Sequence, residues 1–219
     1  MINKIKYVIL LFLVIAFACQ GCASIDTKKD KPAKEYADEG MEFYKDKDYK
    51  YAIESFQKIK DWYPFSKYSV LADLKIADSH YNLKQYNEAV AAYEEFEKLH
   101  PANESVPYTI FQTGLCYFEQ VDTPDRQQAT ARKTIETFNR LNKLFPKNTY
   151  SLKTNKYINK CYKSIAKSEL GIGLYYYKSK HYKAALHRFK NVIIRYPDTG
   201  AHHKAITYIA KCETAITKK

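Results

Sequence analysis

Two cysteines near the N-terminus stand where a covalent modification could occur. Lys4 and Lys6 precede an uncharged apolar run over residues 7–18, which ends in small residues before Cys19 and Cys22. The run is too short for an ordinary transmembrane helix but suits the apolar region of a secretory signal. Small residues before a cysteine at this place are typical of a bacterial lipobox, in which the cysteine receives lipid and becomes the mature N-terminus.

This pattern predicts a lipoprotein signal peptide over residues 1–21, with cleavage before Cys19 or Cys22 and a lipid anchor on that cysteine. Cys19 is slightly favoured because acceptable small or apolar residues precede it, although Cys22 follows the more typical Gly21. An ordinary signal peptide with incidental cysteines is the alternative. Residues 22–32 are polar and rich in Lys and Asp, so they are expected to form a flexible tether.

Motifs for other chemistry are missing from the sequence, which contains no Gly-rich phosphate loop, no HExxH and no GxSxG. Cys116, Cys161 and Cys212 form no CxxC pair and are expected to be buried thiols, although a disulfide between two of them stays open. His202 and His203 are adjacent, and neighbours on a helix point about 100° apart, which does not suit a shared metal ion. We therefore expect no enzymatic activity, no metal and no cofactor beyond the covalent lipid.

The charge of the chain is strongly basic. Its 36 Lys and Arg residues outnumber 24 Asp and Glu residues, which gives a net charge of +12. Such an excess suggests an acidic partner, an anionic membrane surface or nucleic acid. The lysines are scattered along the sequence and no nucleic-acid-binding motif accompanies them, so no nucleic-acid partner is expected. Carboxylates such as Asp78 are expected on solvated faces.

A repeat of the tetratricopeptide type organises the rest of the chain. This repeat is a 34-residue helix–turn–helix with a small residue at its eighth position, an aromatic residue at its twenty-fourth and proline at its thirty-second. The small residues are Gly40, Ala77, Gly114 and Gly173, the aromatic residues are Phe56, Tyr93, Phe138 and Phe189, and the prolines are Pro64, Pro101, Pro146 and Pro197. A small residue on the first helix lets the second helix approach closely, and proline ends the second helix because it lacks a donor.

The spacing predicts an all-α solenoid of antiparallel helix hairpins with a right-handed superhelical path, over residues 33–219. The repeats are expected at about 33–66, 70–103, 107–148 and 166–199, followed by a capping helix at 201–217. Residues 151–166 fall outside these frames, but their apolar residues follow helical spacing and no helix breaker follows them. We expect one long helix running from this segment into the fourth repeat.

The first helices of the repeats line the concave groove in this repeat class. The predicted groove is apolar and aromatic, which suits an extended or helical peptide with aromatic side chains. The residues expected to bind the peptide are Leu74, Tyr81, Phe111, Leu115 and Phe118. The alternative is that aromatic residues at these repeat positions only pack the helices.

The segments between the repeats carry a more specific resemblance. A Tyr-Pro-Phe-Ser run at 63–66 follows the first repeat, residues 103–115 lead into the third, and a polar insertion at 122–126 precedes a helix containing Ala and Arg. Together with the lipobox, this succession resembles the BamD family of outer-membrane assembly lipoproteins over nearly the whole mature chain. The resemblance implies a non-enzymatic scaffold or adaptor, held on the periplasmic face of the outer membrane by its acyl chains.

The same resemblance implies two kinds of partner. The N-terminal repeats would bind unfolded outer-membrane protein precursors, whose last strand ends in an aromatic residue. The C-terminal repeats would hold a BamA-like barrel subunit, beside other assembly lipoproteins, and their basic residues Arg188, Lys190 and Arg195 would suit an acidic docking surface. A repeat lipoprotein of another envelope machine (pilus assembly or cell-division coordination) and a non-catalytic subunit of an envelope hydrolase remain alternatives.

Overall fold

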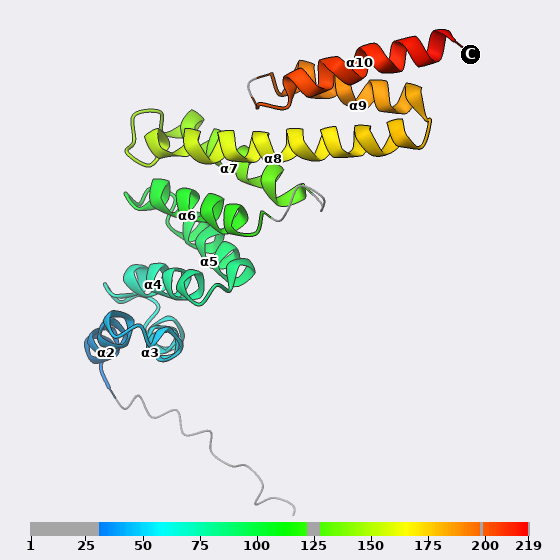
Figure 1. Ribbon diagram of the computed structural model, residues 1–219. Coiled ribbons are helices and arrows are strands. Elements are labelled where there is room, and N and C mark those ends of the chain that lie inside the picture. The colour runs from blue at the N-terminus through cyan, green and yellow to red at the C-terminus, as the bar shows by residue number, and fades with distance from the viewer. Residues whose placement is uncertain (1–30, 122–127, 198, 219) are drawn as a thin grey trace, which may run out of the picture. The chain divides into compact units, whose positions relative to one another are not determined.

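The computed structural model describes residues 31–121, 128–197 and 199–218, and throughout these segments the regular structure is helical (Figure 1). The helices are α2 (Ala33–Lys45), α3 (Tyr49–Trp62), α4 (Ser69–Asn82), α5 (Tyr86–Leu99), α6 (Val106–Glu119), α7 (Ala129–Leu144), α8 (Ser151–Lys178), α9 (Tyr182–Arg195) and α10 (His202–Thr217). Residues 33–219 form one compact unit. The predicted signal peptide, both candidate lipid-bearing cysteines and the insertion at 122–126 lie outside the described residues.

Helices that follow one another in sequence pack against one another, from α2 on α3 through to α9 on α10 (Figure 1). A single helix hairpin cannot bury its apolar side, so this stacking supplies the core. The prediction of an all-α solenoid of helix hairpins is confirmed. Within the described segments, no helix has both the length and the apolarity that crossing a membrane requires.

The turns inside three of the hairpins share one geometry. A lysine with positive φ follows the first helix in each, at Lys47 (66°), Lys84 (59°) and Lys180 (61°). The next N–H then donates back to a carbonyl five residues earlier, as Asp48 N does to Phe43 O at 2.8 Å. These bonds satisfy carbonyls that the helix end leaves free, which is the Schellman arrangement. This shared turn connects the two helices in the same way in these three hairpins.

The small and aromatic repeat positions meet between the two helices of a hairpin. A Cβ placed on Gly40 would lie 2.9 Å from the Phe56 ring, and one placed on Gly173 would lie 2.6 Å from the Phe189 ring. Each of these rings is fully buried. The space left by the glycine is therefore filled by the aromatic residue of the second helix.

The second helix of every hairpin ends two residues before a proline, as α3 does at Trp62 before Pro64 and α9 does at Arg195 before Pro197. Helix α8 runs unbroken for 28 residues. Its first half packs against α6 and α7, and its second half packs against α9 (Figure 1). Gly171 and Gly173 do not interrupt it, and Gly173 is the small residue that faces Phe189.

Candidate peptide-binding face

The five residues of the predicted groove lie on two helices, with Leu74 and Tyr81 on α4 and Phe111, Leu115 and Phe118 on α6. Leu74 packs against the core cluster of Phe111 and also against the cluster that includes Tyr81. The predicted residues of both helices therefore pack against neighbouring core clusters, which Leu74 connects. We call Tyr81, Phe111, Leu115, Phe118 and Tyr157 of α8 the aromatic face.

Tyr157 connects these rings. Its ring centroid lies 4.9 Å from that of Phe118, in an edge-to-face arrangement, and 6.1 Å from that of Phe111. Such pairs contribute beyond the area they bury. The sequence prediction missed Tyr157 because residues 151–166 fall outside the repeat frames, so no groove position was assigned there. The helical spacing of Tyr157 with buried Ile158 and Cys161 was the available signal.

The residues of the aromatic face differ in how much surface they keep. Phe111 is only 7% exposed and packs against Phe138, with ring centroids 5.6 Å apart, so it belongs mainly to the core. Tyr81, Leu115 and Phe118 are half-buried. Burial, followed by the nearby Glu119 charge, raises the pKa of Tyr81 to about 12. These three side chains are the part of the face that a ligand could contact.

Asp78 lies beneath this region and is 3% exposed, so the expectation that it is solvated is wrong. The hydroxyls of Tyr93 and Tyr108 each donate to its Oδ1 at 2.8 Å. Lys75 Nζ donates to its Oδ2, also at 2.8 Å. Burial followed by the Asp78 charge raises the pKa of both tyrosines. A carboxylate removed from water needs such partners, and three donors supply them here.

Cations border the aromatic rings. Lys75 Nζ lies 4.5 Å from the centroid of the Tyr44 ring, and Lys156 Nζ lies 4.7 Å from that of Tyr157. Lys160 Nζ lies 5.8 Å from the centroid of Phe118. A surface of this composition can stack on an aromatic side chain and attract a neighbouring carboxylate.

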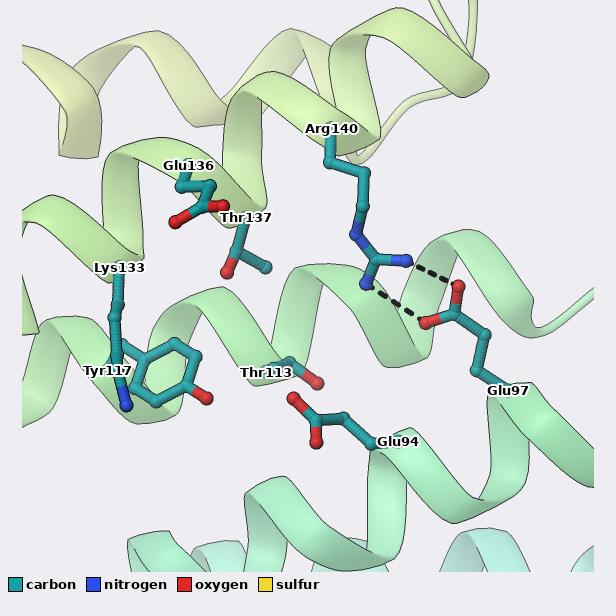
Figure 2. A pocket seen from close by; sticks show the side chains of 8 residues that line it. All are labelled: Glu94, Glu97, Thr113, Tyr117, Lys133, Glu136, Thr137 and Arg140. Carbon is teal, nitrogen blue, oxygen red and sulfur yellow. Dashed lines mark hydrogen bonds and ion pairs between the residues drawn. The ribbon is translucent and has the colours of Figure 1, made fainter.

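A charged cleft of about 380 Å³ lies between α5, α6 and α7 (Figure 2). Arg140 donates two hydrogen bonds to Glu97, at 2.5 and 2.9 Å, and these bonds chiefly raise the pKa of the guanidinium. Figure 2 shows Glu94 across the cleft from Glu136. Because the bidentate pair fixes α7 on α5, we interpret this cleft as a contact between repeats rather than as a binding site.

The predicted docking residues are largely paired within the chain. Arg188 donates to both carboxylate oxygens of Glu169, at 3.1 and 3.2 Å, and Lys190 lies 3.5 Å from Glu213. Arg195 is exposed and lines a cavity of about 540 Å³. Of the three predicted docking residues, Arg195 is therefore the one most accessible to a partner.

The three described cysteines are free and buried. Burial raises the pKa of Cys116 to about 12 and that of Cys161 to about 11, so these thiols stay protonated and act as small apolar groups. Within the described segments, no group of three or more His, Cys, Asp or Glu side chains is placed to hold a metal ion.

Stacked helix hairpins with this repeat spacing define a helical-repeat protein of the tetratricopeptide class. A family model described as "Outer membrane lipoprotein" (YfiO) matches residues 29–219. The chain belongs to this YfiO family of outer membrane lipoproteins.

Named relatives are similar over most of this chain. An outer membrane protein assembly factor BamD of Rickettsia prowazekii is 30% identical over 198 residues, covering 90% of this chain and 79% of that protein. Its counterpart in Caulobacter vibrioides is 26% identical over 199 residues, covering 89% of this chain. The match spans 65% of the Caulobacter protein's length, slightly less than two thirds. Among solved structures, a thermophilic TPR protein of Thermus thermophilus matches with a TM-score of 0.44 and 11% identity, covering 82% of this chain and all of that one.

Proposed function

We propose that this protein is a non-enzymatic adaptor in the assembly of outer-membrane proteins. The observation that supports this role most strongly is the family match over residues 29–219, together with relatives that are named assembly factors. Acyl chains on Cys19 or Cys22 would hold it on the periplasmic face of the outer membrane. Two binding surfaces would then serve the assembly reaction.

The first surface is the aromatic face. Unfolded barrel precursors that end in an aromatic side chain would place that ring against Tyr81, Leu115 and Phe118. Support comes from the half-exposed rings and from the cations beside them, which suit a chain end that is both aromatic and negatively charged. The buried Asp78 network would hold α4, α5 and α6 in fixed register beneath this surface.

The second surface is the basic C-terminal half, which would hold the central barrel subunit and other assembly lipoproteins. Exposed Arg195 is the docking residue that the structure leaves most available. Arg188 and Lys190 would instead contribute by joining α9 to α8 and to α10 through Glu169 and Glu213.

Crosslinking in intact cells, followed by purification of the tagged chain from outer membranes, tests the proposal. We expect the central barrel subunit among the crosslinked proteins, and a lipid-modified cysteine in mass spectra of the N-terminal peptide. A variant with both Cys19→Ser and Cys22→Ser should leave the outer-membrane fraction. Recovery of pilus, cell-division or hydrolase components in place of the barrel subunit would refute the proposed role.

A further inference from the structure

Within residues 33–219, the net positive charge lies in the C-terminal half. Residues 33–121 contain 10 Lys and Arg against 16 Asp and Glu, a net charge of −6. Residues 129–219 contain 20 Lys and Arg against 4 Asp and Glu, a net charge of +16. The lysines that look scattered in the sequence therefore gather on the C-terminal repeats.

Five of these lysines form a row on α8. Their positions are Lys153, Lys156, Lys160, Lys163 and Lys167, with alternating spacings of three and four residues, and all five are exposed. That spacing keeps side chains on one stripe of a helix, here about 21 Å long at 1.5 Å per residue. The stripe lies opposite the side that α8 buries with Ile158, Cys161 and Ile165. We call it the lysine row.

Among the residues that the structure describes, no carboxylate is paired with a lysine of the row. Among the carboxylates described in the C-terminal half, Glu169 is paired with Arg188 and Glu213 with Lys190. Glu136 lies in the charged cleft with Lys133. Within the described segments no lysine of the row forms an ion pair, although three of them lie over the rings of Tyr150, Tyr157 and Phe118. Like charges three and four residues apart repel one another along a helix, so the row is not explained by stability of the free chain.

A cavity of about 540 Å³ adjoins the row. It is lined by Lys163 of the row, by Asn159 and Tyr162 of α8, and by Arg195 at the end of α9. Arg195 adds a sixth cation without an ion-pair partner in the described segments. The cavity also offers an amide and a tyrosine ring, which can receive one side chain of a bound segment.

We propose that the lysine row and this adjoining cavity bind an acidic helical segment of a partner protein. A second helix with Asp or Glu every three and four residues presents a stripe of matching spacing and length, so several carboxylates can face several lysines at once. The observations favour a protein segment over an anionic membrane. A membrane surface requires only a broad positive patch. A single narrow stripe of lysines beside a cavity instead matches the shape of one bound polypeptide segment. This site does not depend on peptide binding at the aromatic face. It lies on the same basic half as the second surface proposed above and shares Arg195 with it, but it rests on the lysine row and does not require the barrel subunit to be the partner.

Titration of the full chain with designed peptides tests the site. The probe is a helical peptide with glutamates every three and four positions, and its comparison is a peptide of identical composition in scrambled order. The row variant combines Lys153→Glu, Lys163→Glu and Lys167→Glu, which leaves the lysines beside the aromatic face unchanged. The matched control combines Lys143→Glu, Lys183→Glu and Lys204→Glu, which are exposed lysines of the same half outside the row. Both variants change the net charge equally, and circular dichroism checks that both keep their helices.

We expect the row variant to bind the ordered peptide at least 10-fold more weakly, and the control less than 3-fold more weakly. The scrambled peptide should bind more weakly than the ordered one. Equal losses in both variants would show diffuse attraction and overturn the proposal. It would also be overturned if vesicles containing phosphatidylglycerol discriminated between the variants while the ordered peptide did not. An aromatic-ended peptide titrated in parallel reports on the aromatic face, so failure at one site is distinguishable from failure at the other.

Discussion

Asp78 is the residue on which the N-terminal repeats converge. Its carboxylate accepts hydrogen bonds from Tyr93 of α5 and Tyr108 of α6, while Lys75 of its own helix extends the contact to the Tyr44 ring of α2. A buried carboxylate is costly unless it is paired and hydrogen-bonded, and removing one partner of such a group leaves the others unsatisfied. The network should therefore specify one arrangement of these helices.

Asp78→Ala should lower the free energy of unfolding by about 3–5 kcal/mol, because it leaves Lys75 and the hydroxyls of Tyr93 and Tyr108 without their acceptor. Tyr93→Phe removes one donor and leaves the other contacts, so it should cost only about 1 kcal/mol. Urea unfolding followed by circular dichroism measures both. An Asp78→Ala variant no less stable than Tyr93→Phe would contradict the role given to the network.

Alkaline pH should destabilise the chain. The pKa of Cys116 is raised from 9.0 and that of Tyr81 from 10.0, each to about 12, because burial disfavours their charged forms. The unfolded chain therefore loses these protons first, and stability should fall between pH 9 and pH 12. The urea midpoint across this range measures the fall. Tyr81→Phe should make the loss of stability with rising pH smaller above pH 10. Tyr175→Phe, at a residue that is 68% exposed, should leave this loss unchanged.

At the scale of the helices, the contact between a small residue and an aromatic ring sets how closely two helices of a hairpin approach. Gly114 faces Phe138 as Gly40 faces Phe56. These rings are fully buried, so they have little room to move when volume is added. Gly171, two residues before the Gly173 contact, has nothing within 4 Å of an added Cβ and provides a matched comparison.

Gly114→Ala should therefore destabilise the fold by about 1–3 kcal/mol, since the new methyl group collides with the Phe138 ring. Gly171→Ala should stabilise it by about 0.5–1 kcal/mol, because alanine favours the helix more than glycine does. Chemical denaturation of the two variants gives the comparison. If Gly114→Ala stabilises the fold as Gly171→Ala does, helix propensity rather than close approach governs these positions.

The helix pairs could be predicted from the sequence because each signal is local to a repeat. Gly40 with Phe56 and Trp62 before Pro64 lie within one 34-residue frame, so their spacing alone indicates a hairpin. Contacts between frames could not be predicted in the same way. Asp78 receives Tyr108 from the next hairpin, and only the packed structure shows that this carboxylate is buried. Tyr157 was missed for a similar reason, since residues 151–166 fall outside the repeat frames.

For the candidate site, the sequence predicted which helices carry its residues but not how exposed each residue is. Leu74, Tyr81, Phe111, Leu115 and Phe118 were placed on the first helices of two repeats, and the structure has them on α4 and α6. Sequence positions do not show how much of a ring its neighbours cover, so the mostly buried Phe111 could not be separated from the half-exposed Phe118. Lysines at helical spacing are common on exposed helix faces, and only the packed structure shows that those of the row have no carboxylate partner among the described residues.

At the scale of the whole molecule, residues 33–219 carry two surfaces of different chemistry. The acidic N-terminal half carries Tyr81 and Phe118, and the basic C-terminal half carries the lysine row. Tyr157 and Lys160 of α8 contact Phe118 and so mark where these surfaces meet. Added salt weakens binding through charge more than binding through aromatic contacts, so a salt titration distinguishes binding at the two surfaces.

A peptide that copies the last strand of a barrel protein, ending in an aromatic residue, should bind the aromatic face of the full chain. A flexible peptide loses conformational entropy on binding, so we expect a Kd on the order of micromolar or weaker. Tyr81→Ala and Phe118→Ala should weaken binding because they remove surface that the peptide contacts. Tyr175→Ala on α8, outside the face, is the control and should leave binding unchanged.

Titration at low and high salt distinguishes this account from purely electrostatic attraction. If the basic surface alone held the peptide, added salt would abolish binding and the two aromatic substitutions would have no effect. The thermal midpoint of each variant completes the test, because Tyr81 and Phe118 are half-buried and their loss should leave the fold nearly intact. If Phe118→Ala unfolds the chain instead, its ring belongs to the core with Tyr157, and the assignment of this face to peptide binding fails.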